Sequence, residues 1–195
     1  MSRHGCWQPR SAGHLAPVLR RWLSEPDSLT ARCQRHCREF RIRPLCQARM
    51  TPLAEEARVR GCLPVREVLL ECDGVPVVFA HSALSSVRGG RLARWFAGLG
   101  SRSLGSLLFA HPGFRRELIE YCRLLPGHPL HRRLCALSGR NWPILWARRS
   151  RHHFGAASVL VCEVFLPALM TLPAVAGGLQ WAVSRPATST GSGLR

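Results

Sequence analysis

The feature that most constrains the fold is a pair of β-rich apolar runs joined by Asp73 and Gly74, within PVREVLLECDGVPVVFAHSAL at residues 64–84. An Asp-Gly pair between two such runs indicates a tight β-hairpin, because both turn residues must adopt positive φ. Side chains alternate between the two faces of a strand, which places Arg66 on one face and Glu67 on the other. The hairpin therefore predicts antiparallel strands whose mainly apolar faces each carry charge.

Arg66 is the first of two charges that stand in apolar strands. Its side chain does not lose its proton, so a buried guanidinium must contact an anion or several carbonyl oxygens. The second is Glu163, in the run SVLVCEVFL, where burial disfavours the ionised carboxylate unless a cation lies close. The two charges can pair directly, or across a ligand with a carboxylate at one end and a hydroxyl at the other. A structural ion pair, or a guanidinium that reaches solvent at a sheet edge, is the alternative.

Helical periodicity alternates with strand patterns along the rest of the chain. Alternation of polar and apolar residues predicts a strand in EFRIRPL, before a polar loop at 47–61, and ILWARRSRHHF with SVLVCEVFL predicts a second hairpin around Gly155. Residues 126–143, with three prolines and two glycines, are predicted to be a long connection. Short helices are predicted at 15–23, at 29–37 after a cap at Asp27 or Ser28, and from 88 to the glycines at 98 and 100. This order predicts one α+β domain with an antiparallel sheet.

The chain carries 28 basic residues, all of them Arg, against 11 acidic residues, which gives a net charge of +17. Nucleic-acid-binding proteins gather their basic residues on one face, with aromatic residues between them. Here the arginines occur in scattered pairs, such as Arg115-Arg116 and Arg148-Arg149. We therefore do not expect a nucleic-acid partner.

Nine cysteines occur at irregular spacing, several of them inside apolar runs. An odd number without a regular pattern argues against a disulfide framework and is typical of a reducing compartment, so a cytoplasmic location is predicted. Cys33, His36 and Cys37 share one face of a predicted helix, as metal ligands would, but no fourth ligand stands at a suitable spacing. We interpret the cysteines as buried thiols on an amphipathic helix and predict no metal site.

The sequence divides into a mobile N-terminal segment at residues 1–13, a domain at 14–169, and a tail at 170–195 that is first apolar and then contains Ser and Gly. The N-terminus lacks the continuous apolar region of a signal peptide. Residues 159–183 hold a single charge, but prolines and glycines interrupt them, so stable membrane insertion is not expected, while a role of the tail at a membrane surface stays open. A monomer is the default expectation, since only the tail offers an exposed apolar stripe.

Five motifs together resemble the chorismate lyase family. SEPDSLT, LPVREVLLECDGVPVVFA, RSLGSLLF, LWARRS and CEVFLPA occur in the order and approximate spacing of that family, from about Leu15 to Leu169. Chorismate lyases convert chorismate to 4-hydroxybenzoate and pyruvate in the first committed step of bacterial ubiquinone biosynthesis. The resemblance implies an antiparallel six-stranded sheet with helices packed on it, an enclosed site, and no metal or organic cofactor.

The resemblance also implies roles for four residues. By position in the motifs, Arg66 would pair with the ring carboxylate of the ligand, and Glu163 would face its ring hydroxyl. Leu29 and Leu104 would line the site and offer backbone amides in loops that close over the ligand. Whether Glu163 acts as an acid, a base or a hydrogen-bond anchor is open at this stage.

One pair of residues departs from the family pattern. After VFA the family commonly has Arg-Thr, whereas this chain has His81 and Ser82, which predicts a weaker second contact near the site. The alternative function is a non-catalytic domain of the same fold that binds a small aromatic acid, as in the effector-binding domains of certain bacterial transcription regulators. A basic nucleic-acid-binding protein is the third hypothesis.

Overall fold

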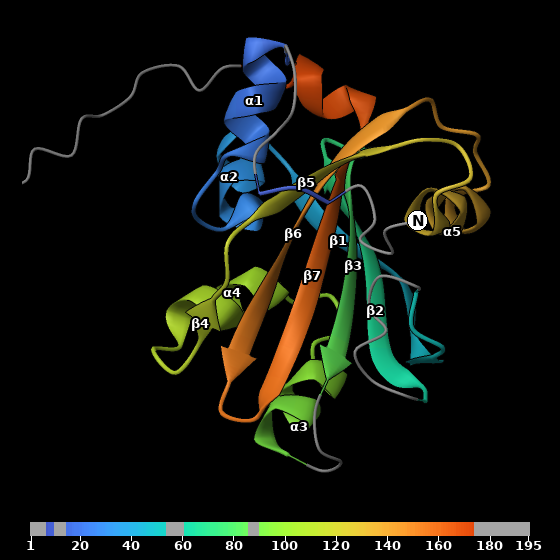
Figure 1. Ribbon diagram of the computed structural model, residues 1–195. Helices are drawn as coiled ribbons and strands as arrows, with labels where there is room; N and C mark the ends of the chain where they lie inside the picture. Colours follow the sequence, from blue (N-terminus) through green and yellow to red (C-terminus); the bar gives the residue numbers. More distant parts are fainter. Residues whose placement is uncertain (1–6, 10–14, 54–60, 86–89, 174–195) are drawn as a thin grey trace, which may run out of the picture.

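The computed structural model describes residues 7–9, 15–53, 61–85 and 90–173. Over these ranges the chain forms one antiparallel sheet with helices packed on it (Figure 1). The strands are β1 (Phe40–Met50), β2 (Leu63–Cys72), β3 (Val75–Ser85), β4 (Arg115–Arg116), β5 (Glu120–Leu124), β6 (Leu145–Phe154) and β7 (Ala157–Phe165). The helices are α1 (Pro17–Leu23), α2 (Leu29–Arg35), α3 (Arg91–Ala97), α4 (Leu104–Ala110), α5 (Pro129–Ser138) and the 3-10 helix η1 (Pro167–Thr171). The α+β class is confirmed.

The sheet has the strand order β1-β2-β3-β7-β6-β4, and β5 also pairs with β6. All of these pairings are antiparallel. The seven strands exceed by one the six that the family resemblance implies, and β4 is only two residues long. Its short pairing with β6 nevertheless places Arg116 opposite His152.

The first hairpin turns at Asp73 and Gly74, as predicted. Their φ angles of 51° and 78° are both positive, a region that glycine enters without steric cost and that aspartate tolerates better than most residues. Oδ1 of Asp73 accepts hydrogen bonds from the backbone N–H groups of Arg38 and Glu39, at 3.0 and 2.8 Å. The turn is therefore tied to the residues that lead into β1.

Three strand pairings bring charges from distant segments onto one face of the sheet. Arg66 lies opposite Ser82 in the β2–β3 pair, and Ser82 lies opposite Val161 in the β3–β7 pair. In the β6–β7 hairpin, which turns between Phe154 and Ala157, Arg148 lies opposite Glu163. Residues opposed across neighbouring strands share a face, and so do residues two apart along one strand. Arg66, Glu163 and Arg148 consequently stand on the same face.

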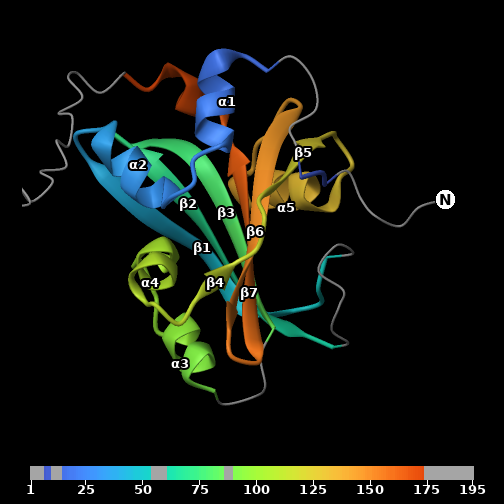
Figure 2. The same ribbon diagram turned by 60° about the vertical axis from the view of Figure 1, so that its left-hand side comes forward.

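Helices cover both faces of the sheet (Figure 2). On one face, α5 packs Leu130 and Leu134 into a core with buried side chains such as Phe79 and Val164. On the other face, α1 and α2 contribute to an apolar cluster at one end, and α3 and α4 contribute to a second cluster at the other end. The part of this face between the two clusters holds the polar and charged side chains.

Two segments differ from the sequence-based prediction. β1 continues to Met50, into the predicted loop 47–61, because it is an edge strand whose exposed polar residues hide the strand pattern. α5 lies inside the predicted connection 126–143. Pro129 occupies its first turn, where a missing N–H removes no helical hydrogen bond, and Gly139, with a φ of 64°, follows its last residue. The residues that suggested a loop are thus the start and stop signals of a helix.

The two ends of the chain are described only in part. Trp7 is buried, and Gln8 exchanges two backbone hydrogen bonds with Tyr121, at 2.9 and 2.7 Å, so these residues of the predicted mobile segment pack against β5. Residues 1–6 and 10–13 of that segment, and the tail beyond residue 173, lie outside the described residues. The predicted domain boundaries therefore stay predictions. None of the described helices is long and apolar enough to cross a membrane.

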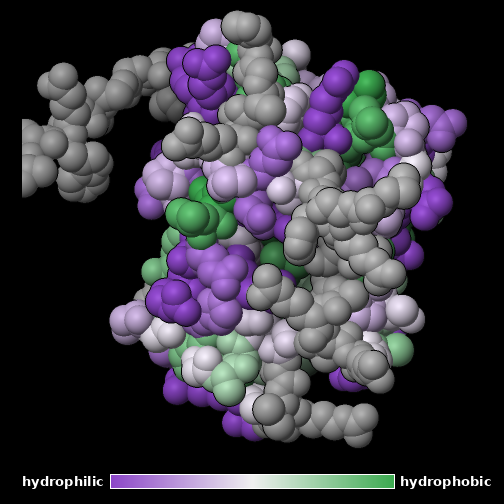
Figure 3. Space-filling model, viewed as in Figure 1, coloured by the Kyte–Doolittle hydropathy of each residue, from purple (hydrophilic) through white to green (hydrophobic). Residues whose placement is uncertain are grey.

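The surface residues and the cysteines relate to two expectations, that the protein has no nucleic-acid partner and that it has no disulfide framework. The face in Figure 3 carries hydrophilic residues in several separate groups, with apolar residues between them. Among the cysteines of the described residues, seven are free thiols, and Cys122 is disulfide-bonded. One bonded cysteine beside seven free thiols does not form a disulfide framework.

Candidate active site

A cavity lies on the polar middle part of the sheet face that α2 and α4 cover. It holds about 550 Å³ of space not filled by protein atoms, its mouth included. Its walls come from six strands, from the start of α2 and from residues along α4. The lining residues are Ser28, Leu29, Thr30, Ile42, Arg66, Val68, Leu70, Ala80, Ser82, Ser103, Leu104, Gly105, Leu108, Phe109, Arg116, Arg148, Ser150, His152, Val161 and Glu163. All four predicted site residues are in this set.

Arg66 presents a buried cation to the cavity. Its side chain is 3% exposed, and its Nη2 donates hydrogen bonds to the carbonyl oxygens of Gly100 and Arg102, both at 2.9 Å. Its Nε is buried and has no hydrogen-bond partner within the described ranges. Burial lowers the pKa of Arg66, yet a guanidinium stays charged in proteins. A buried cation whose two acceptors are neutral carbonyl oxygens, and whose Nε has no acceptor, is suited to bind an anion.

Glu163 does not pair with Arg66 directly. Its Oε2 instead accepts a hydrogen bond from Nε of Arg148, at 2.6 Å. Nη1 of Arg148 also donates to the carbonyl oxygens of Leu23 and Glu25, at 3.4 and 2.5 Å. The direct Arg66–Glu163 pair that the sequence left open is therefore wrong. The possibility that the two charges meet across a ligand is kept, since both line the same cavity.

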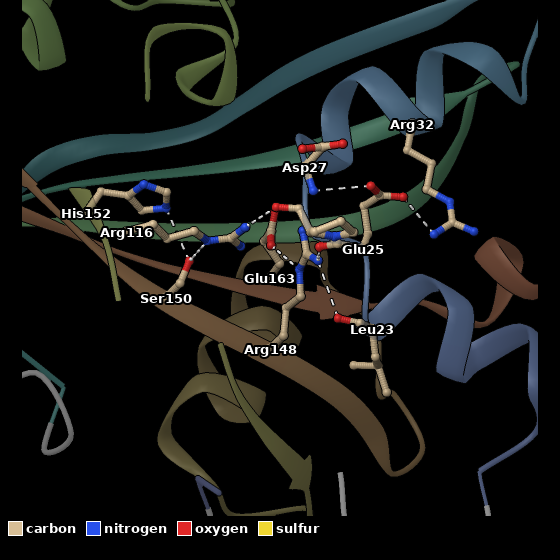
Figure 4. A network of polar contacts seen from close by, with 10 residues as sticks. Leu23, Glu25, Asp27, Arg32, Arg116, Arg148, Ser150, His152 and Glu163 are labelled. Atoms are coloured by element: carbon tan, nitrogen blue, oxygen red, sulfur yellow. Dashed lines mark hydrogen bonds and ion pairs between the residues drawn. The ribbon is translucent and has the colours of Figure 1, made fainter. Parts of the chain in front are cut away.

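A chain of hydrogen bonds leads from Arg116 to His152 along the cavity wall (Figure 4). Nε of Arg116 donates to Oγ of Ser150 at 2.9 Å, and Oγ of Ser150 lies 3.2 Å from Nε2 of His152. Because Arg116 can only donate, the hydroxyl hydrogen of Ser150 is available to the imidazole. Burial, followed by the charges of Arg116, Arg148 and His153, lowers the pKa of His152 to about 4. His152 is therefore neutral at pH 7.

Leu29 and Leu104 are the first residues of α2 and α4, and both are buried in the cavity wall. Serines cap both helices: Oγ of Ser28 accepts from the N–H of Ala31, and Oγ of Ser103 accepts from the N–H of Ser106. The N–H groups of a first helical turn have no acceptor within the helix. This position suits the amide role that the family resemblance implies for the two leucines.

The starts of α2 and α4 approach each other closely at Gly105. A Cβ atom at this position would lie 2.9 Å from Oγ of Ser28, which is closer than real Cβ contacts allow. The glycine inside the apolar run SLGSLLF thus permits two capped helix starts to meet over the cavity. It explains why a helix-disfavouring residue stands at the second position of α4.

His81 lies on the face opposite the cavity. It is buried, and its Nδ1 lies 2.9 Å from Oε1 of Glu67, whose carboxylate also accepts two-pronged hydrogen bonds from Arg133 of α5. Burial raises the pKa of Glu67, but the hydrogen bonds and charges of His81 and Arg133 outweigh it, so the pKa is lowered. His81 itself therefore does not contact the cavity, because alternation along β3 turns it toward α5, and the weaker second contact expected at the His81-Ser82 pair stays a prediction. Its neighbour Ser82 does line the cavity.

Cys33, His36 and Cys37 do not converge. The carbonyl oxygen of Cys33 accepts from Sγ of Cys37 at 3.2 Å, and the thiol of Cys33 is buried in the apolar cluster under α2. Nδ1 of His36 lies 2.8 Å from the carbonyl oxygen of Pro173. Burial is the main cause that raises the pKa of the Cys37 thiol to about 12. Over the described residues, no group of three or more potential metal-ligating side chains is present.

Comparison with known proteins shows the family to which the chain belongs. A family model described as chorismate lyase matches residues 1–174. A probable chorismate pyruvate-lyase of Dechloromonas aromatica is 58% identical over 171 residues, which cover 85% of this chain and 97% of that protein. Another, of Methylobacillus flagellatus, is 43% identical over 175 residues, which cover 87% and 97%. The chain belongs to the chorismate lyase family.

Among solved structures, the effector domain of PhnF from Mycobacterium smegmatis aligns with a TM-score of 0.48 and 13% sequence identity. The alignment covers 73% of this chain and 90% of that domain. Membership of the chorismate lyase family confirms the resemblance seen in the sequence motifs.

Sequence reasoning about this chorismate lyase family member missed three charged or titratable cavity residues. Arg148 and His152 stand in the strand LWARRSRHHF, where every other side chain points to the cavity face, but six consecutive polar residues hide that alternation. Arg116 stands in RRELIEYC, a segment whose residue pattern fits either a helix or a strand. The signal that could have found them is the opposition of Arg148 to Glu163, which follows once the β6–β7 turn is fixed at Gly155.

We predict that His152 makes the stability of the protein depend on pH in acid. The pKa of a buried neutral histidine is lower when folded than the unfolded value near 6.5, so its contribution is complete above pH 6.5 and is lost as the pH falls toward 4. The loss amounts to at most about 3 kcal/mol for this shift.

His152→Gln keeps a donor and an acceptor near Ser150 but does not titrate. Urea unfolding of both proteins at pH 7, 5.5 and 4 measures the difference in their free energies of unfolding, in which other acid titrations cancel. We expect the free energy of unfolding of the wild type to decrease, relative to that of His152→Gln, as the pH falls. A difference that stays constant over this range would show that His152 titrates normally.

Proposed function

We propose that this protein is a cytoplasmic chorismate lyase, acting as a monomer, that releases pyruvate from chorismate and forms 4-hydroxybenzoate at the start of ubiquinone biosynthesis. The observation that carries the proposal is the unmet Nε donor of buried Arg66 in the same cavity as Glu163. Family membership supports chorismate lyase activity, and the groups of the cavity are complementary to an aromatic acid with a hydroxyl opposite its carboxylate. Arg66 binds the ring carboxylate, and Glu163 faces the ring hydroxyl.

The spacing of the two strands suits one aromatic ring. β2 and β7 are separated by β3 in the sheet, so Arg66 and Glu163 project from strands that lie two strand spacings apart, roughly 10 Å. A benzene ring with a carboxylate and a hydroxyl in para positions fits between two polar groups at such a separation. The side chains that lie between and beside them on this face are the apolar Val68, Ala80 and Val161 and the small polar Ser82, so the floor beneath the ring is mainly apolar.

The reaction is an elimination that makes the ring aromatic. The bond between the ring and the ether oxygen breaks, and the oxygen leaves with the enolpyruvyl group. The hydrogen on the neighbouring hydroxyl-bearing carbon is lost as a proton, and its electron pair completes the aromatic ring. The enolpyruvate takes up a proton and becomes pyruvate, so the atoms of chorismate are divided between two products with no other reactant.

The protein has two tasks in this reaction, to orient the ring and to move or hold a proton. A guanidinium that binds a carboxylate through two donors fixes the ring position. Oε2 of Glu163 is held by Arg148, which leaves Oε1 to contact the substrate hydroxyl. The first residues of α2 and α4 exclude water above the ring, with Leu29 and Leu104 as the covering side chains.

The direct test is to incubate the purified protein with chorismate and follow the products. We expect 4-hydroxybenzoate, by chromatography, and pyruvate, by a coupled dehydrogenase assay, to be released in equal amounts. Saturable binding of 4-hydroxybenzoate without product formation would instead identify a non-catalytic binding domain. Salt-sensitive DNA binding without either activity would identify a nucleic-acid-binding protein.

We predict that Glu163→Gln lowers kcat by about 100-fold or more while leaving the affinity for 4-hydroxybenzoate within a few-fold of wild type, because the amide keeps hydrogen bonds but cannot transfer a proton. Steady-state assays give kcat, and calorimetry gives the dissociation constant. Glu120→Gln is the matched control, since Glu120 forms a similar ion pair with Arg149, at 2.7 Å, outside the cavity. A Glu163→Gln variant that turns over like Glu120→Gln would exclude a proton-transfer role.

A further inference from the structure

We propose that Arg116 forms a second carboxylate subsite, which binds the enolpyruvyl carboxylate of chorismate while Arg66 binds the ring carboxylate. The inference rests on the proposed function and adds to it the recognition of the group that departs. The contacts of Arg116, the charge of the cavity and the order of the strands across the sheet support it.

Arg116 is a cation in the cavity wall that is held without a carboxylate partner. It comes from β4, at the far end of the sheet from β1. Its Nε donates to Ser150 at 2.9 Å, and its Nη1 donates to the carbonyl oxygen of Pro26 at 2.6 Å. Both acceptors are neutral, and no ion pair of Arg116 is found among the described residues. Its remaining amino group, Nη2, is thus available to an anion.

Arg148 is placed differently, although it lies nearby. Its guanidinium is engaged by the Glu163 carboxylate and by two backbone carbonyl oxygens. Figure 4 shows Arg116 and Arg148 reaching toward Glu163 from two sides. Since Glu163 balances Arg148, Arg116 is left as the uncompensated cation on this side of the cavity.

The charge of the cavity matches the charge of the substrate. Three guanidinium groups face one carboxylate among the lining residues, which leaves two positive charges. His152 adds none at neutral pH, because burial and the neighbouring arginines keep it neutral. Chorismate carries two carboxylates and is a dianion, whereas 4-hydroxybenzoate is a monoanion. A site that bound only 4-hydroxybenzoate would need one positive charge, for its single carboxylate.

The order of the groups across the sheet matches the order of the groups on chorismate. From β2 through β7 to β4, the cavity presents Arg66, Glu163 and Arg116 in that order. On chorismate, the ring carboxylate lies opposite the hydroxyl, and the enolpyruvyl ether is attached to the carbon next to the hydroxyl. With the ring carboxylate on Arg66 and the hydroxyl at Glu163, the enolpyruvyl group extends toward the β6 and β4 side.

This position also bears on bond breaking. Negative charge develops on the ether oxygen as it leaves with the enolpyruvyl group, and a preorganised cation beside it stabilises that charge. After cleavage, two monoanionic products are bound to separate arginines, 4-hydroxybenzoate to Arg66 and pyruvate to Arg116. Arg116 therefore contributes to recognition of the substrate and not to affinity for the aromatic product.

The first experiment compares three arginine variants. Arg116→Gln should lower kcat/KM for chorismate by about 10- to 100-fold, the effect of losing a charge-assisted contact, and leave the dissociation constant for 4-hydroxybenzoate within about threefold of wild type. Arg66→Gln should weaken both. Arg115→Gln removes the same charge from the exposed neighbour of Arg116 and should change neither. Thermal melting confirms that each variant folds.

The second experiment uses wild-type protein and therefore does not depend on a variant that folds. Calorimetry compares 3-(carboxymethoxy)-4-hydroxybenzoate, which carries a second carboxylate on an ether next to the hydroxyl, with 3-methoxy-4-hydroxybenzoate, which lacks that carboxylate. We expect the dianion to bind at least about 10-fold more tightly. The advantage should disappear in Arg116→Gln and persist in Arg115→Gln.

The outcomes separate this inference from the proposed function. If wild-type protein forms products from chorismate but Arg116→Gln behaves like Arg115→Gln, Arg116 only holds Pro26 and Ser150 and the second subsite is wrong. Equal affinity of wild-type protein for the two ether ligands would overturn it as well. Loss of 4-hydroxybenzoate binding in a folded Arg116→Gln variant would place Arg116 in the ring subsite instead. Absence of products with wild-type protein would contradict the proposed function itself.

Discussion

The site depends on the burial of Arg66 in a sheet face without a carboxylate to neutralise it. A guanidinium cannot be discharged, and removing it from water is costly unless its donors are met. Here Gly100 and Arg102 provide two carbonyl oxygens, and Nε is left without an acceptor in the described part of the chain. The fold thus maintains a buried arginine whose hydrogen-bond donors are incompletely satisfied within the described part of the chain.

The rest of the architecture holds that arginine in place. Two hairpins joined through β3 and β7 carry the charged residues onto a common face, and apolar clusters at both ends of that face keep the helices packed around them. The opposite face uses its buried charges differently. There the Glu67 carboxylate is paired with both His81 and Arg133, and this ion network ties α5 to the sheet. On the cavity face, by contrast, Nε of Arg66 has no hydrogen-bond partner among the described residues. One face is therefore structural, and the other is suited to binding.

The sequence predicted the features that depend on local rules. The Asp73-Gly74 turn and the alternation along β2 sufficed to place Arg66 on one face and Glu67 on the other, and the family motifs pointed to Glu163, Leu29 and Leu104. Their roles remain proposals, but all four site residues line one cavity.

Features that depend on long-range pairing could not be predicted in this way. The partner of Glu163 is Arg148, which the register of β6 against β7 decides, and Arg116 enters the site through a strand of two residues. α5 was missed because its proline and glycine also fit a loop. In each case the deciding contacts join segments whose local patterns are ambiguous, so only the assembled sheet resolves them.

The most direct measurement of the central claim is a crystal structure of the protein with 4-hydroxybenzoate. The account predicts that the ring lies in the cavity under α2 and α4, with a carboxylate oxygen within hydrogen-bond distance of Nε of Arg66 and the hydroxyl at Oε1 of Glu163. A product molecule bound outside this cavity, or bound in reverse with its carboxylate on Arg116 and Arg148, would contradict it.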